Sequence, residues 1–170
     1  MSSQVLLKSL FEYKAWANDT LYRAMLDIGD ENSPSYRTAL STLNHAHIVD
    51  RIFMAHLEGR SHSYSTNEPD DVPAADRLFS DVRETDAWYI GYMRNVTPEE
   101  LSEMVAFQFT DGKPGRMSRE EMLAHVITHG GYHRGEVGRL LPQVSDAASG
   151  DVFAGFLHRT DPSRRNFESK

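Results

Sequence analysis

The sequence has 170 residues, of which 39% are hydrophobic and 25% are charged, and these proportions are ordinary for one folded domain. It contains no cysteine, which excludes disulfide scaffolds, thiolate nucleophiles and cysteine-ligated zinc or iron–sulfur sites. The formal net charge is −7, whereas nucleic-acid binding requires a basic surface. We therefore expect a single domain over residues 1–170 that binds no nucleic acid.

Charged residues interrupt the apolar stretch near the N-terminus, which argues against a secretory signal peptide. Lys8, Glu12 and Lys14 fall within the first apolar stretch. Elsewhere, no stretch approaches the roughly 18 consecutive apolar residues of a membrane span. We therefore expect a cytoplasmic protein without a membrane partner.

The first two long helices are predicted by apolar residues that recur at steps of three and four. The first helix covers residues 4–28 and ends at Gly29. The second begins with Ser33 as its N-cap and Pro34 at the first helical position, and it continues to about Leu57. Both helices are amphipathic, so each is expected to bury one face.

A polar connection over residues 59–72 separates the second helix from a third. We expect the third helix from Pro73 to about Asn95, because apolar residues again recur at helical steps. The sequence then runs from Thr97 through Pro98 and two glutamates, which is a capping box and predicts a short helical turn.

A small β-hairpin is predicted next, from segments 104–110 and 115–117 on either side of a turn sequence. Ser118 opens a second capping box and with it a fourth long helix, which Pro142 terminates. A short last helix is expected over residues 151–159.

Four long amphipathic helices and one hairpin predict an all-α fold. We expect a four-helix bundle with a small hairpin excursion before the fourth long helix, a short C-terminal helix and a flexible tail over about 159–170. Sites in such bundles lie between facing helices, so inward-facing polar residues are the ones to examine.

Histidine is unusually frequent, with eight in the chain, and three recur at steps of four in the fourth helix. His125 and His133 are about 12 Å apart along the helix axis, so one ion cannot bind all three. His129 and His133 share an apolar stripe and form the favoured pair, while His125 is an outer contact or a surface residue. The alternative interpretation is two core histidines without a metal, or a solvated edge of the helix.

A third ligand is sought in the second helix. His45 has apolar neighbours one turn away and is expected to point inward, whereas His47 has polar neighbours and is expected to face solvent. His56 shares the sector of His45 but lies about 16 Å further along the axis. His45 is therefore the best third candidate. Three imidazoles leave coordination positions open, which is typical of catalytic metal sites.

Three segments resemble the DinB-like family of metal-dependent bundle proteins, also called YfiT-like. They are TLNHAHIVDRIF (42–53), HVITHGGYHRGEVGRLL (125–141) and the opening FEYKAWANDTLYRAM (11–25). Their order and spacing match the family over about residues 4–158, so the resemblance covers nearly the whole chain.

The resemblance implies a metal held by the histidine after the asparagine of the second helix and by both histidines of the fourth-helix motif. In this sequence these residues are His45, His129 and His133. Two positions depart from the family pattern: Glu136 replaces a frequent glutamine, and Tyr132 replaces a frequent histidine. Neither is expected to touch the ligands, although both could change the pocket.

The family includes thiol-dependent transferases and isomerases, proteins assigned as hydrolases, and members without a known reaction. The resemblance therefore implies a metal-dependent enzyme that acts on a small molecule, with a low-molecular-weight thiol as a candidate cosubstrate, and it assigns no catalytic residue. A non-catalytic metal-binding or stress-response module is the main alternative, and a metal-free partner-binding bundle is a weaker one. Zinc or nickel is the favoured metal, with iron and copper as alternatives.

Glycines line one face of the fourth helix at positions 131, 135 and 138. They indicate close approach of another helix, from this chain or from a second copy, or else space for a ligand beside the metal. Because related bundles pair through helices, we expect a homodimer. Arg134 is expected to be a structural salt-bridge partner, with anchoring of a substrate anion as the alternative.

Overall fold

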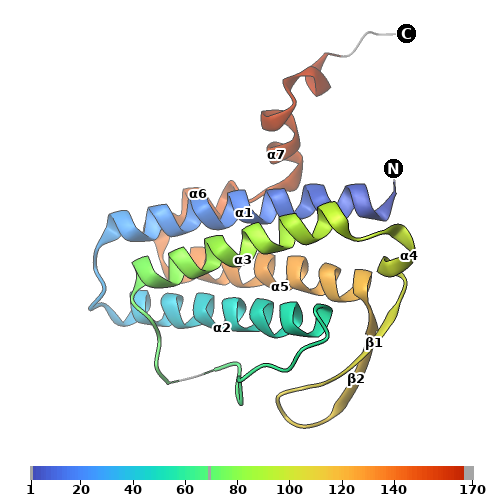
Figure 1. The fold of residues 1–170 in the computed structure, drawn as a ribbon. Helices are drawn as coiled ribbons and strands as arrows, with labels where there is room; N and C mark the ends of the chain where they lie inside the picture. Colours follow the sequence, from blue (N-terminus) through green and yellow to red (C-terminus); the bar gives the residue numbers. More distant parts are fainter. Residues whose placement is uncertain (1, 69, 167–170) are drawn as a thin grey trace.

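The computed structural model describes residues 2–68 and 70–166 and confirms the predicted mainly-α fold. Its four long helices run alongside one another as a bundle (Figure 1). Their bounds are α1 (Ser3–Ile28), α2 (Pro34–Leu57), α3 (Ala75–Asn95) and α5 (Arg119–Leu140). In this bundle α1 packs chiefly along α3 and α2 along α5, so the second and fourth long helices face each other.

The helix starts follow the local sequence closely. The Ser33 hydroxyl accepts a hydrogen bond from the Tyr36 amide at the start of α2. Both predicted capping boxes form, at Thr97 before the short α4 (Pro98–Leu101) and at Ser118 before α5. The third helix differs slightly from expectation, because Ala74 is its N-cap and Pro73 lies outside it. Each satisfied cap adds on the order of 1 kcal/mol to helix stability.

Two apolar clusters divide the core along the length of the bundle. The cluster toward α4 includes Phe11, Phe53 and Tyr89, and the cluster toward the α1–α2 connection includes Leu21 and Val137. Between them lies a layer of buried polar residues contributed by all four long helices. Its members are Lys14, Asn18, Asn44, His47, Asp50, Thr85, Asp86 and Arg134. Lys14 and Arg134 of this layer lie next to Gly130 of α5, the residue after His129.

The predicted hairpin forms from β1 (Met104–Gln108) and β2 (Pro114–Ser118), paired antiparallel. Residues of alternating burial give it one face toward the bundle, which carries Phe107 and Met117. Gly112 in its turn has φ +84°, a conformation that favours glycine. The hairpin leads directly into α5 at the end of the bundle where α4 lies (Figure 1).

The chain after α5 contains more helix than the sequence predicted. A 3₁₀ turn (Pro142–Val144) and α6 (Ser145–Ser149) precede α7 (Phe153–Thr160), and a further 3₁₀ turn covers Pro162–Arg165. The expected short helix over residues 151–159 is therefore confirmed as α7, which begins two residues later and ends one residue later. This helix projects from the bundle (Figure 1). Helical turns continue into the segment expected to be a flexible tail, whose last residues, 167–170, lie outside the described part of the chain.

The glycines of α5 have separate surroundings. A Cβ atom at Gly138 would overlap the side chain of Ala148 in α6, so at this position the neighbouring helix belongs to the same chain. Gly135 has open space where a Cβ would lie. A helix of the same chain therefore approaches closely at Gly138, and no described residue of the chain does so at Gly135.

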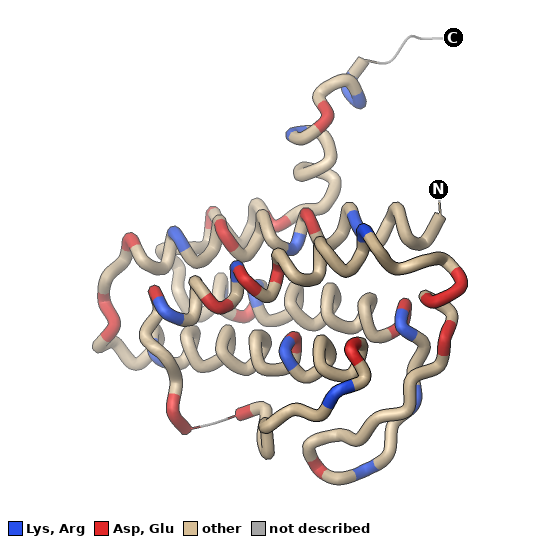
Figure 2. The backbone as a smooth tube through the Cα atoms, in the orientation of Figure 1, with Lys and Arg blue, Asp and Glu red and all other residues tan. Residues whose placement is uncertain are grey.

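Charged residues are distributed over many elements (Figure 2). Lysine and arginine positions are scattered along the backbone, and acidic residues gather at the α1–α2 connection and near α4. Within the described residues, no helix has the length and apolarity needed to cross a membrane.

Candidate metal centre

The three histidines predicted to bind a metal meet between α2 and α5. The Nε2 atom of His129 lies 3.2 Å from Nε2 of His45 and 3.1 Å from Nε2 of His133. One ring nitrogen from each of the three residues lies within 4.8 Å of the other two. Two of these side chains come from one face of α5, at positions four residues apart, and the third comes from the facing helix.

The outer nitrogens of two of these histidines are held by oxygen acceptors. His45 Nδ1 lies 3.1 Å from the carbonyl oxygen of Asn67, and His133 Nδ1 lies 2.6 Å from a carboxylate oxygen of Glu136. These oxygens accept hydrogen bonds, so in each neutral ring the proton is placed on Nδ1 and Nε2 keeps its lone pair. Both lone pairs therefore point at His129.

His129 cannot donate a hydrogen bond to both His45 and His133 at the same time. Burial, followed by the nearby His133, lowers its pKa to about 3, so the ring is neutral at pH 7. A neutral ring has one N–H and can donate to only one of the two lone pairs. A cation at their centre would bind the inner nitrogen of each of the three rings, and tetrahedral ligation at 2.0–2.1 Å gives nitrogen–nitrogen separations of about 3.3 Å. The cluster can therefore hold a divalent metal.

Glu136 and Tyr132 both touch His133 of the cluster, which corrects the expectation from sequence. Glu136 lies three residues after His133, and this helical offset places its carboxylate over the outer nitrogen of that ring. The Tyr132 ring packs edge-on against His133 with centroids 5.1 Å apart. A carboxylate is a stronger acceptor than an amide oxygen and makes the His133 ring more basic.

The remaining histidines lie outside the cluster. His125 is half-buried and stacks on His129, with ring centroids 5.3 Å apart. Of the two expected alternatives, an outer contact or a surface residue, it is therefore the outer contact. His56 contacts His62 instead, with ring centroids 5.2 Å apart. His47 was expected to face solvent, and this is wrong: only 9% of it is exposed, and burial lowers its pKa to about 4.

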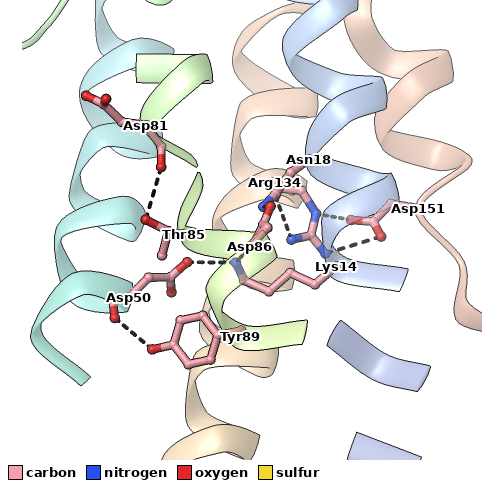
Figure 3. A network of polar contacts seen from close by, with 9 residues as sticks. All are labelled: Lys14, Asn18, Asp50, Asp81, Thr85, Asp86, Tyr89, Arg134 and Asp151. Carbon is pink, nitrogen blue, oxygen red and sulfur yellow. Dashed lines mark hydrogen bonds and ion pairs between the residues drawn. The ribbon is translucent and has the colours of Figure 1, made fainter. Parts of the chain in front are cut away.

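The error at His47 has a physical cause in the buried polar layer. Its neighbour Asp50, which made that face of α2 look solvated, is itself buried and accepts a hydrogen bond from Lys14 at 2.7 Å. Lys14 also reaches Asp86 at 2.7 Å (Figure 3). Burial alone lowers the Lys14 pKa, but the two carboxylates outweigh it and the net pKa is raised, so the ammonium stays charged.

Arg134 extends this network on the side of α5. It is 2% exposed, donates to the Asp151 carboxylate at 2.6 Å and donates to Asn18 at 3.1 Å (Figure 3). The predicted role as a salt-bridge partner is therefore confirmed. Asn18 in turn donates to Asp86, so the interactions join α1, α3 and α5.

Gly130 allows this network to pass directly behind the histidine cluster. A Cβ there would lie 3.2 Å from Lys14 Cε and 3.2 Å from Arg134 Nη1. Because Gly130 follows His129 in α5, the buried ions fix the segment of helix that carries the central histidine. Lys14 was not predicted to be buried, although its position between Phe11 and Asn18 on the inward face of the first helix could have indicated it.

Two cavities border the histidine cluster on different sides. One, of about 440 Å³, has His45 and His129 in its wall, and lies between α2, α5 and the hairpin. The other, of about 550 Å³, has His45, His133 and Glu136 in its wall and opens at the surface. A small molecule can therefore reach the cluster.

The chain is similar to known proteins over nearly its whole length. The family model described as "DinB family" matches residues 1–161. The chain is also similar to Protein DinB of Bacillus subtilis (strain 168), with 22% identity over 165 residues that cover 89% of this chain and 93% of that protein. No solved structure matches the chain. With nearly its whole length matched by the family model, the chain belongs to the DinB family.

Proposed function

We propose that the protein binds one divalent transition metal per chain through His45, His129 and His133, and that it uses this centre to act on a small molecule. The observation that carries the proposal is the pair of hydrogen bonds to Asn67 and Glu136. These bonds hold the protons of two imidazoles on their outer nitrogens and direct the inner lone pairs to one point.

The residues around the centre have distinct tasks in this proposal. The Asn67 carbonyl and the Glu136 carboxylate orient the rings of His45 and His133, so that Nε2 of each ring faces the proposed metal position. The buried ions behind Gly130 hold α5 in position. A bound divalent ion would supply Lewis acidity, which lowers the pKa of a bound thiol or water and polarises a carbonyl.

A metal-dependent enzyme is favoured over a non-catalytic metal module by access to the site. A purely structural ion is normally enclosed by four protein ligands, whereas three histidines meet here and cavities border them on two sides. Thiol-dependent transfer or isomerisation and hydrolysis are the reaction classes proposed. Zinc or nickel is the metal proposed first, because imidazole suits both, with iron and copper next.

Metal loading followed by a reaction screen tests the proposal. The protein is loaded separately with zinc and nickel, desalted, and analysed for metal per chain; close to one ion is expected. The loaded forms are then assayed for transfer of low-molecular-weight thiols to electrophiles and for ester and amide hydrolysis. Stable binding of one ion without turnover in any assay would favour the non-catalytic module, and failure to retain metal would refute the proposal.

A further inference from the structure

The cavity beside His45 and His129 has the size of a small-molecule binding pocket. Its volume is about 440 Å³, within the range of a few hundred to a thousand Å³ that is usual for such sites. The hairpin supplies one wall, with Phe107 and Met117, and α2 and α5 supply the others. One end of the cavity therefore reaches the histidine cluster and the other end reaches the hairpin.

The walls of this cavity are uncharged. The apolar lining residues are Val49, Ile52, Phe53, Phe107, Phe109 and Met117. The polar ones are histidines together with Asn67 and Thr110, and within the described part of the chain no lysine, arginine, aspartate or glutamate lines it. Burial lowers the pKa of His56, so this imidazole is neutral at pH 7. Such a lining favours an uncharged, apolar occupant.

The hairpin sequence is suited to building the aromatic wall. Phe107 pairs across the strands with Gly115. A Cβ at Gly115 would lie 2.6 Å from Phe107 Cζ and 2.8 Å from Phe109 Cε2, so both rings pack over the bare glycine backbone. A larger residue at this position would have to displace both rings. The glycine thus fixes the shape of the cavity wall rather than the turn of the hairpin.

The second cavity at the cluster has the opposite character. Glu68, Asp70 and Glu136 line it together with His133, so its surface is acidic. The two sides of the histidine cluster therefore differ: one is apolar and enclosed by the hairpin, and the other carries carboxylates.

We infer that the hairpin cavity receives the uncharged aromatic or branched aliphatic body of a molecule whose polar group binds at the three-histidine centre. This inference rests on the proposed metal-binding function and adds the class of ligand. His125 gives the cavity a polar contact as well. Its ring lies between Phe53 and His129, at centroid distances of 4.8 and 5.3 Å, and no described residue hydrogen bonds to it. The imidazole is free to bond a polar atom of the ligand.

Two hydroxamates test the inference on the zinc-loaded protein. Acetohydroxamate and benzohydroxamate carry the same metal-binding group and differ in a methyl against a phenyl. Titration calorimetry should show benzohydroxamate binding about 10- to 100-fold more tightly, as expected when a phenyl ring is buried in an apolar cavity. Equal affinities would overturn the inference and leave the metal centre intact.

The metal-free protein provides an independent measurement. N-phenyl-1-naphthylamine is uncharged, has no metal-binding group and becomes fluorescent in apolar surroundings. It should bind the metal-free protein saturably at one site, in the absence of any hydroxamate. If neither hydroxamate binds the zinc form, the proposed open metal centre is refuted, and this fluorescence titration alone decides whether the cavity takes apolar molecules. Absence of saturable binding overturns the inference.

A matched pair of methionine variants assigns the binding to this cavity. Met117 lines it, whereas Met104 on the other strand of the same hairpin is 49% exposed and outside it. Met117→Glu should abolish both the phenyl preference and the dye binding, and Met104→Glu should change neither. Phe107→Ala serves as a second cavity variant if Met117→Glu does not fold. Equal effects of the two methionine variants would overturn the inference.

Discussion

The Nδ1 atom of His133 lies 2.6 Å from a carboxylate oxygen of Glu136, three residues further along α5. A carboxylate in this position holds the ring proton on the outer nitrogen and increases the electron density available at Nε2. The same helix thus supplies a proposed metal ligand and the group that orients it. Glu136 is therefore a positioning residue of the proposed metal centre.

Replacing Glu136 should weaken metal binding without removing it. Glu136→Ala is expected to lower zinc affinity about 10- to 100-fold, the usual effect of losing such an outer partner, and Glu136→Gln should have a smaller effect because an amide oxygen still accepts the bond. Competition with a chromophoric chelator measures the affinity. Glu84→Ala, at an exposed position of α3, is the control. Equal affinities of the wild type and Glu136→Ala would show that the contact does not tune the ligand.

Alanine variants of the three proposed ligand histidines should retain much less metal than alanine variants of the neighbouring histidines. His45→Ala should remove most of the bound metal, because two remaining imidazoles hold an ion weakly. His125→Ala is the matched control, since that ring lines the same cavity but lies outside the cluster. His56→Ala should also leave occupancy unchanged. Full retention of metal by His45→Ala would refute the assigned ligand set.

The histidine cluster could be predicted from sequence because helical periodicity gives the face of each side chain. Apolar neighbours of His45 and a shared stripe for His129 and His133 were sufficient, and the structure brings these three residues together. The same rule failed at His47, because a polar neighbour was read as evidence of solvent. Asp50 is polar yet buried, and its partner Lys14 comes from another helix.

Long-range pairing of this kind has no signal in local spacing. Lys14 and Asp86 are 72 positions apart in the chain, and only the packing of α1 against α3 brings them to 2.7 Å. The contact of Glu136 with His133 was likewise missed, although an offset of three residues on one helix is sufficient for it. Cavities are harder still, since the hairpin wall depends on how far Phe107 reaches over the bundle.

Removing the buried ammonium should destabilise the protein strongly. Lys14→Met leaves Asp50 and Asp86 buried beside each other without their cation, and breaking a buried pair in this way costs about 3–5 kcal/mol. Urea denaturation at pH 7.5 measures the free energy of unfolding. Arg23→Met, which removes an exposed pair with Asp19, should change it by less than about 1 kcal/mol.

Neutralising the carboxylates as well should recover part of that loss. A triple variant with Lys14→Met, Asp50→Asn and Asp86→Asn has no uncompensated buried charge, so it should be more stable than Lys14→Met alone. If the single variant is as stable as the wild type, the lysine is not buried between these carboxylates in solution.

The buried imidazole of His47 should make stability depend on pH in a defined direction. Burial, with Arg51 and Lys14 contributing, lowers its pKa from the ordinary 6.5 to about 4 in the folded protein. Between these values the unfolded chain binds the proton more readily, so stability is lost as pH falls from about 6.5 toward 4. From pH 7.5 to 4.5 the loss from this one group is about 2.5 kcal/mol.

His47→Gln removes the titration and leaves the surrounding charges of Lys14, Arg51 and Asp86 in place. Urea denaturation of the metal-free wild type and variant at pH 7.5, 6.0 and 4.5 gives the difference in unfolding free energy at each pH. Use of the metal-free forms makes the protonation of the other histidines common to both proteins, so it cancels. The difference should shift in favour of the variant as pH falls. A difference that stays constant across this range would mean that His47 is protonated as easily in the folded protein as in the unfolded chain, and is therefore exposed to solvent.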